Sequence, residues 1–176
     1  NQEELIKDDE RWQKELIKEQ LKAEKEWEKD KDKNEKLLVK YQLQLREGKN
    51  VQDKIDELMD KIEEDNRMLV NKKAGWLYVV SNPSFGTNVF KIGISRRISV
   101  YERLAELSSS SIPFKYSINC LIWSEDVFKL ESSLHREFKE YKINFQKPHR
   151  ELFKLPLSQI EKVVKEKYEP NAIFDY

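Results

Sequence analysis

The chain has 176 residues, of which 38% are charged and 38% hydrophobic, and its 33 basic and 33 acidic side chains cancel to a net charge of zero. A single cysteine, Cys120, excludes an internal disulfide framework and a cysteine-rich zinc site, and its apolar surroundings favour a buried structural thiol. No apolar run approaches the roughly 18 residues of a membrane span and no signal peptide is visible, so we expect a soluble, cytoplasmic protein; an anchor upstream of Asn1 stays open.

Charge is divided unevenly along the chain. Residues 1–70 hold 16 basic and 21 acidic side chains, for a net charge of about −5, whereas residues 71–176 hold 17 and 12, for about +5. We therefore predict two parts with different partners: a charged helical or coiled-coil segment over residues 1–72 and a globular domain over residues 73–176.

The first part reads as helix, because residues 3–46 contain neither proline nor glycine. Glu47-Gly48-Lys49-Asn50 breaks the pattern. Apolar residues mark a seam on each side of this break: Leu5, Trp12, Leu16, Ala23, Leu38, Tyr41 and Leu45 before it, and Val51, Ile55, Leu58, Ile62 and Leu69 after it.

Two arrangements fit the break at residues 47–50. Either the helices fold into an antiparallel hairpin, or they are offset and each pairs with another protomer. A long helix has little to pack on within so small a chain, so we favour an oligomerisation stalk or spacer, with a homo-oligomer as its product. The alternative is a solvated helix that only joins domains.

The second part begins with a predicted hairpin. Alternation places Leu77 and Val79 on one face of its first strand, with Trp76 and Tyr78 on the other. The second strand alternates in the same way, with Val89, Lys91 and Gly93 opposite Phe90 and Ile92.

Three helices and a third strand follow. Ser99 and Glu102 form a capping box that predicts a helix from Val100, and residues 115–123 alternate as a strand. Further helices are predicted from Ser124 to about residue 141, and over residues 159–168. The fold class is therefore α+β: a small three-stranded antiparallel sheet flanked by helices and preceded by the long helices.

Short motifs in this part resemble the GIY-YIG nuclease superfamily, in the branch named after a reading frame of phage T5. The first motif stands as Gly75-Trp76-Leu77-Tyr78, and the second as Lys91-Ile92-Gly93, with lysine in place of the family's tyrosine. Arg103 looks like the family's helix arginine, LESSLHREF at residues 130–138 is similar to its metal-carboxylate helix, and EYKIN and HRELF are similar to its closing segment. The resemblance covers roughly residues 73–157.

This resemblance implies a metal-dependent site. Glu131 would be the ligand of Mg²⁺ or Mn²⁺, because Mg²⁺ is commonly held by one or two carboxylates together with waters and phosphates. Tyr78 would act as a general base or orient water, and Lys91 would lower its pKa or hold a phosphate oxygen. Arg103 would clamp the phosphate. His135, four residues after Glu131, would contact the scissile phosphate or the metal water.

Three further residues are expected near DNA. Arg96 and Arg97 would grip the backbone independently of sequence, and Asn144 would supply a polar side chain near the site. Each candidate also has a structural interpretation: a tyrosine packed on a strand, a surface lysine, a solvated carboxylate or histidine, or loop arginines that confer solubility.

The leading hypothesis is a metal-dependent DNA endonuclease, with a role in phage biology or bacterial phage defence implied by the resemblance. A catalytically silent DNA-binding module on an oligomerising stalk is the alternative, supported by Lys91 in place of tyrosine. A purely structural coiled-coil protein is a third interpretation, against which the motif spacing argues.

Overall fold

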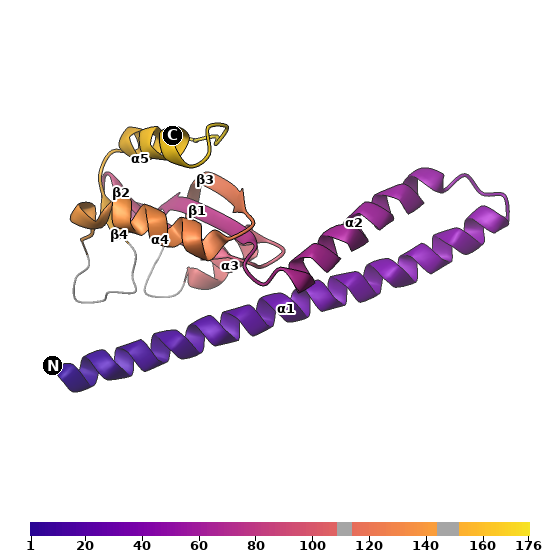
Figure 1. Cartoon of the computed structure of the whole chain (residues 1–176), viewed down its shortest axis with the longest axis horizontal. Helices are drawn as coiled ribbons and strands as arrows, with labels where there is room; N and C mark the ends of the chain where they lie inside the picture. Colours follow the sequence, from indigo (N-terminus) through magenta and orange to yellow (C-terminus); the bar gives the residue numbers. More distant parts are fainter. Residues whose placement is uncertain (109–113, 144–151) are drawn as a thin grey trace. The chain divides into compact units, whose positions relative to one another are not determined.

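The computed structural model describes residues 1–108, 114–143 and 152–176. The chain divides into two compact units, Asn1–Lys72 and Lys73–Tyr176, which we describe separately (Figure 1). In the described part of the chain, no helix combines the length and the apolar character that a membrane crossing requires.

The first unit is an antiparallel helical hairpin, the first of the two predicted arrangements. It consists of α1 (Gln2–Arg46) and α2 (Gln52–Val70). Lys54 Nζ lies 5.4 Å from the centre of the Tyr41 ring near the turn, and Lys72 pairs with Glu24 at the other end. Since α2 has 19 residues and α1 has 45, α2 lies against only the C-terminal part of α1 (Figure 1).

A polar cluster lies inside the hairpin. Asn34 Nδ2 donates hydrogen bonds to Asp30 Oδ2 at 3.1 Å and to Asp65 Oδ2 on α2 at 3.0 Å. Only 1% of Asp65 is exposed. Burial, followed by the hydrogen bond with Asp30, raises the pKa of Asp65 from 3.8 to about 7.

The second unit is built on a four-stranded antiparallel sheet with the order β3-β1-β2-β4. Its strands are β1 (Gly75–Ser81), β2 (Val89–Ser95), β3 (Ser117–Ser124) and β4 (Leu152–Lys154). The α+β class is confirmed, but the prediction of three strands was wrong. The three residues of β4 are too few to show alternation, and they join the sheet only by pairing with residues 89–91 of β2.

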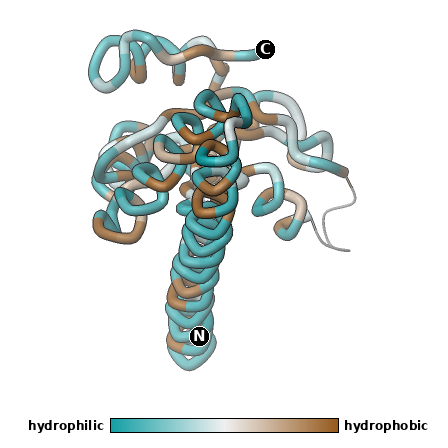
Figure 2. Tube along the Cα trace, turned by 90° about the vertical axis from the view of Figure 1, so that its right-hand side faces the viewer, coloured by the Kyte–Doolittle hydropathy of each residue, from teal (hydrophilic) through white to brown (hydrophobic). Residues whose placement is uncertain are grey.

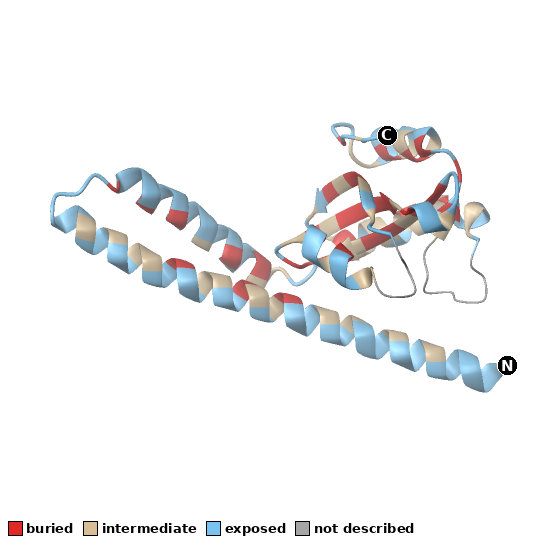
Figure 3. Cartoon of the chain, turned by 180° about the vertical axis from the view of Figure 1, so that it is seen from behind, coloured by how far each residue is buried: buried red, intermediate tan, exposed pale blue. Residues whose placement is uncertain are grey.

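Helices cover both faces of the sheet (Figure 3). The larger core contains Leu77, Val79, Phe90 and Ile92, with the buried sides of α4 (Val127–Glu137) and α5 (Leu157–Lys167). On the opposite face, α3 (Val100–Leu107) packs on the side chains of β1 that alternate with these. The predicted assignment of residues to the two strand faces is thus confirmed. Cys120 is buried in the larger core, as predicted.

Helix starts followed prediction in one case and differed in two. Ser99 Oγ accepts from Glu102 N and caps α3 as expected. The N-cap of helix α4 is Asp126, which accepts from Lys129 N, and it lies two residues after the predicted N-cap Ser124. Helix α5 begins at Leu157, because the preceding Pro156 already fixes a φ of −62°.

Candidate functional site

Tyr78 and Gly93 are cross-strand partners, Tyr78 on β1 and Gly93 on β2. A Cβ atom at Gly93 would lie 2.5 Å from Tyr78 Oη and 2.6 Å from its Cζ. The tyrosine ring therefore extends from β1 across β2 and occupies the space that a side chain at residue 93 would take. Only 3% of Tyr78 is exposed, so the surrounding structure fixes the position of the phenol.

Lys91 and Arg103 lie on the same face of the sheet as this phenol. Lys91 pairs with Val80, and directly opposed residues in an antiparallel sheet share a face. Val80 and Tyr78 belong to the core cluster that includes Leu104 of α3. Arg103 precedes Leu104, is partly buried, and lies 3.8 Å from Glu106 on the same helix. Three of the predicted site residues thus share the α3 face.

His135 approaches from the other face, on α4. Its Nε2 atom lies 2.9 Å from the carbonyl oxygen of Ile92, and its ring contacts Phe153 at 5.2 Å. A carbonyl can only accept, so Nε2 carries the proton and Nδ1 is the acceptor of the neutral ring. Burial lowers the pKa of His135 from its ordinary 6.5, which keeps the ring neutral at physiological pH.

Glu131 lies one helical turn before His135, about 6 Å along α4. The helix is anchored at its start, where Val127 N donates to Lys73 O and the Val127 side chain lies beside Gly75. Glu131 is therefore placed between the beginning of β1 and Ile92, along β2, and is half-buried.

The predicted site residues on the two faces of the sheet both lie near strand β2. Among the described residues, β4 pairs with the outer edge of β2 only over residues 89–91, next to Ile92 and Gly93. The Tyr78 ring reaches this part of β2 from the α3 face, and His135 reaches it from the α4 face. The Tyr78 phenol and the His135 imidazole thus lie on opposite faces of β2, at the consecutive residues Gly93 and Ile92.

Comparison with known proteins identifies the second unit. A family model described as the T5orf172 domain matches residues 75–167, more than half of the chain. The chain belongs to this family. Its name refers to phage T5, so the T5orf172 domain relates the chain to a phage-related group of domains. No curated protein and no solved structure matches the chain.

Two arginines of the T5orf172 domain are less accessible than we expected. Arg96 is 6% exposed and its Nε donates to Ala74 O at 2.8 Å. Arg97 is 2% exposed and binds Glu106 through both terminal nitrogens, at 2.8 and 3.0 Å. These contacts favour structural roles, and DNA binding by either residue stays a prediction. Asn144 lies outside the described residues.

Sequence reasoning missed Glu106. This carboxylate accepts the bidentate pair from Arg97 and lies 3.8 Å from Arg103, so it connects the β2–α3 loop to the predicted phosphate clamp. The i,i+3 spacing of Arg103 and Glu106 on α3 was the available signal. Among the residues that the structure describes, no three His, Cys, Asp or Glu side chains form a metal-binding group.

Proposed function

We propose that the T5orf172 domain of this chain is a divalent-metal-dependent endonuclease of the GIY-YIG superfamily that cleaves DNA phosphodiester bonds. One observation carries the proposal: the Tyr78 phenol and the His135 imidazole reach adjacent residues of β2 from its two faces. Lys91 lies beside the phenol, and Glu131 lies one turn from the imidazole. The phage-related family favours a role in phage biology or phage defence.

The residues on α4 fit a weakly coordinated hard cation. Glu131 would hold Mg²⁺ or Mn²⁺, and one carboxylate suffices where waters and phosphate oxygens complete the coordination. His135 is no ligand through Nε2, because that atom bears a proton and binds Ile92 O. When bound, the ion would neutralise charge on the phosphoryl oxygens and make a water molecule more acidic.

The remaining residues bind and orient. Arg103 presents a guanidinium that can hold two phosphate oxygens, and Lys91 adds a positive charge on the same face. The Tyr78 oxygen, fixed over Gly93, would orient the attacking water, or accept its proton where Lys91 favours the phenolate form. His135 Nδ1 would accept a hydrogen bond from a water molecule.

The second candidate function is a catalytically silent DNA-binding module. It is favoured by Lys91, which stands where the superfamily motif has a second tyrosine, so that the pair of phenols is reduced to one. Such a module would bind DNA without turnover.

Plasmid nicking in the presence of Mg²⁺ or Mn²⁺ tests the proposal. We expect the parent chain to nick supercoiled DNA, and Glu131→Gln to lower the rate by a factor on the order of 10³ while retaining DNA binding in a gel shift. Glu140→Gln removes an exposed carboxylate just beyond α4 and serves as the matched control, with parental activity expected. DNA binding without cleavage by any of these proteins would establish the silent module instead.

A further inference from the structure

Basic side chains on α1 follow a strict period. Their spacing is 4, 3 and 4 residues, repeated three times without interruption: Lys7, Arg11, Lys14, Lys18, Lys22, Lys25, Lys29, Lys33, Lys36 and Lys40. An 11-residue repeat corresponds to about 3.67 residues per turn, so these side chains follow one side of a straight α-helix. We call this set the lysine ridge.

The lysine ridge holds most of the positive charge of α1. It contains ten of the twelve basic residues of the helix within a sector of about 100°, and all ten are exposed. Only three acidic residues share that sector, Glu4, Glu15 and Asp32. The ridge therefore has a net charge of about +7 on a unit whose total charge is negative.

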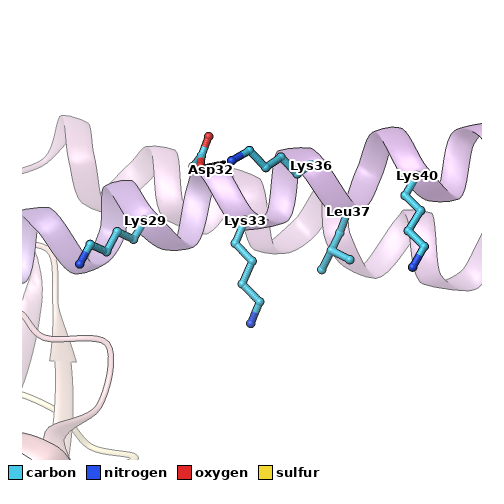
Figure 4. A pocket seen from close by; sticks show the side chains of 6 residues that line it. All are labelled: Lys29, Asp32, Lys33, Lys36, Leu37 and Lys40. Carbon is cyan, nitrogen blue, oxygen red and sulfur yellow. Dashed lines mark ion pairs between the residues drawn. The ribbon is translucent and has the colours of Figure 1, made fainter.

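The ridge lies opposite α2. Ala23 and Trp27, the buried apolar residues of α1, each precede a ridge lysine by two positions, which is about 200° around the helix. Figure 4 shows Lys29, Lys33 and Lys40 projecting to the same side of α1, where they line a shallow hollow with Leu37. Lys36 in the same region pairs with Asp32 at 3.0 Å.

We propose that the lysine ridge binds the phosphate backbone of double-stranded DNA, independently of sequence. From Lys7 to Lys40 it extends about 50 Å, which corresponds to about 15 base pairs of B-form DNA. A row of cationic side chains matches a linear polyanion. The DNA backbone winds around the duplex axis, whereas the lysine ridge is straight. Each bound duplex therefore contacts only some of the basic side chains of the ridge.

In the C-terminal part of α1, the structure favours DNA over a lipid surface. A membrane-bound amphipathic helix buries a broad apolar face beneath its basic residues. Along the C-terminal part of α1 the face opposite the ridge is occupied by α2. Figure 2 shows α1 as a largely hydrophilic helix with separated hydrophobic positions.

Equilibrium binding of a fluorescent 25-base-pair duplex to the full chain, measured at several NaCl concentrations, tests the ridge. The ridge variant combines Lys18→Gln, Lys29→Gln and Lys40→Gln, which lie 11 residues apart on one line. We expect at least about tenfold weaker binding at 100 mM salt, and a slope of log K against log salt that is smaller by roughly 1 to 3, depending on how many of the three lysines contact phosphate. The control combines Lys31→Gln, Lys49→Gln and Lys61→Gln, which lie off the ridge, and binds as the parent does.

Equal losses in the two triple variants, or no binding by the parent chain, would overturn the proposal. Ridge-dependent binding to anionic phosphatidylserine vesicles, with unchanged DNA affinity, would assign the surface to membranes instead. The choice of DNA as probe rests on the proposed nuclease function, but the two can fail separately. Ridge-dependent binding without cleavage would contradict only the nuclease, and cleavage with no ridge effect would contradict only the ridge.

Discussion

Gly93 decides where the Tyr78 phenol lies, because the ring fills the volume that any side chain at this position would need. We predict that Gly93→Ala lowers the free energy of unfolding by about 1–3 kcal/mol and reduces cleavage, since the ring must move. Urea denaturation and the nicking assay measure the two effects. In the Tyr78→Ala background the same substitution should have little further effect on stability; a full additive loss there would show that the contact does not operate.

Arg97 and Arg103 both interact with Glu106, but we expect their substitution by alanine to affect stability and cleavage differently. Arg97→Ala removes a bidentate pair whose arginine is buried and whose carboxylate is partly exposed, and should lower the free energy of unfolding by about 2 kcal/mol. Arg103→Ala removes a longer and more exposed contact, so less than about 1 kcal/mol is expected, yet cleavage should fall sharply if Arg103 clamps phosphate. Thermal melts and nicking rates of the two variants separate a role in stability from a role in cleavage. If Arg103→Ala mainly lost stability and Arg97→Ala mainly lost cleavage, Arg97 would be the phosphate clamp and Arg103 the structural residue.

The relative positions of candidate residues along a helix were easier to predict than their burial and their long-range partners. The placement of Glu131 one turn before His135 on the same helix followed from their i,i+4 spacing. The burial of Arg96 and Arg97 did not follow, because two arginines after a strand read as exposed loop until the carbonyl of Ala74 and the carboxylate of Glu106 are known to face them. Long-range partners of this kind leave no local signature in a single sequence.

The α1–α2 hairpin carries a pH dependence of its own. In the folded hairpin Asp65 keeps its proton up to a pKa of about 7, whereas the unfolded carboxyl ionises near 3.8. The stabilisation is therefore complete below pH 4 and is lost as the pH rises to about 7. The charged groups facing Asp65 are Asp30 on α1 and Glu64 on α2, and both repel its ionised form.

We predict that Asp65→Asn stabilises the hairpin at pH 8, on the order of 3 kcal/mol, and removes its loss of stability between about pH 4 and pH 7. An amide can still accept from Asn34 and donate to Asp30 without bearing charge. Urea titrations followed by helical circular dichroism measure this, and Asp60→Asn, at an exposed position on α2, should leave the parental pH dependence intact. An unchanged profile in Asp65→Asn would place the titrating group elsewhere.

Elements with strong local signals were predictable, and those defined by their partners were not. The hairpin break at residues 47–50 and the start of α3 at Val100 follow from glycine and from capping. Strand β4 and the choice between a hairpin and offset helices depend on contacts far apart in sequence, such as Asn34 with Asp65. The net charge of residues 1–70 likewise did not reveal the lysine ridge, because a sum over the segment does not distinguish the charges on different sides of α1.

At the scale of the whole molecule, net charge describes neither unit. A chain with a formal charge of zero carries a concentrated positive row on one helix and a buried carboxyl group, that of Asp65, inside the same hairpin. The T5orf172 domain supplies the candidate chemistry through side chains from β1, β2, α3 and α4 around one strand. The two proposals together predict that salt concentration modulates DNA affinity through the helix, and that metal concentration modulates turnover through the domain.

The sole thiol of the molecule is 2% exposed, and burial, together with repulsion from Glu161, raises the pKa of Cys120 to about 11. Maleimides react with thiolates, so the native chain should stay unmodified at pH 7. A single cysteine introduced at an exposed site, for example Lys29→Cys, would then take up a dye or spin label alone. Site-specific labelling for spectroscopy would therefore not require prior substitution of Cys120.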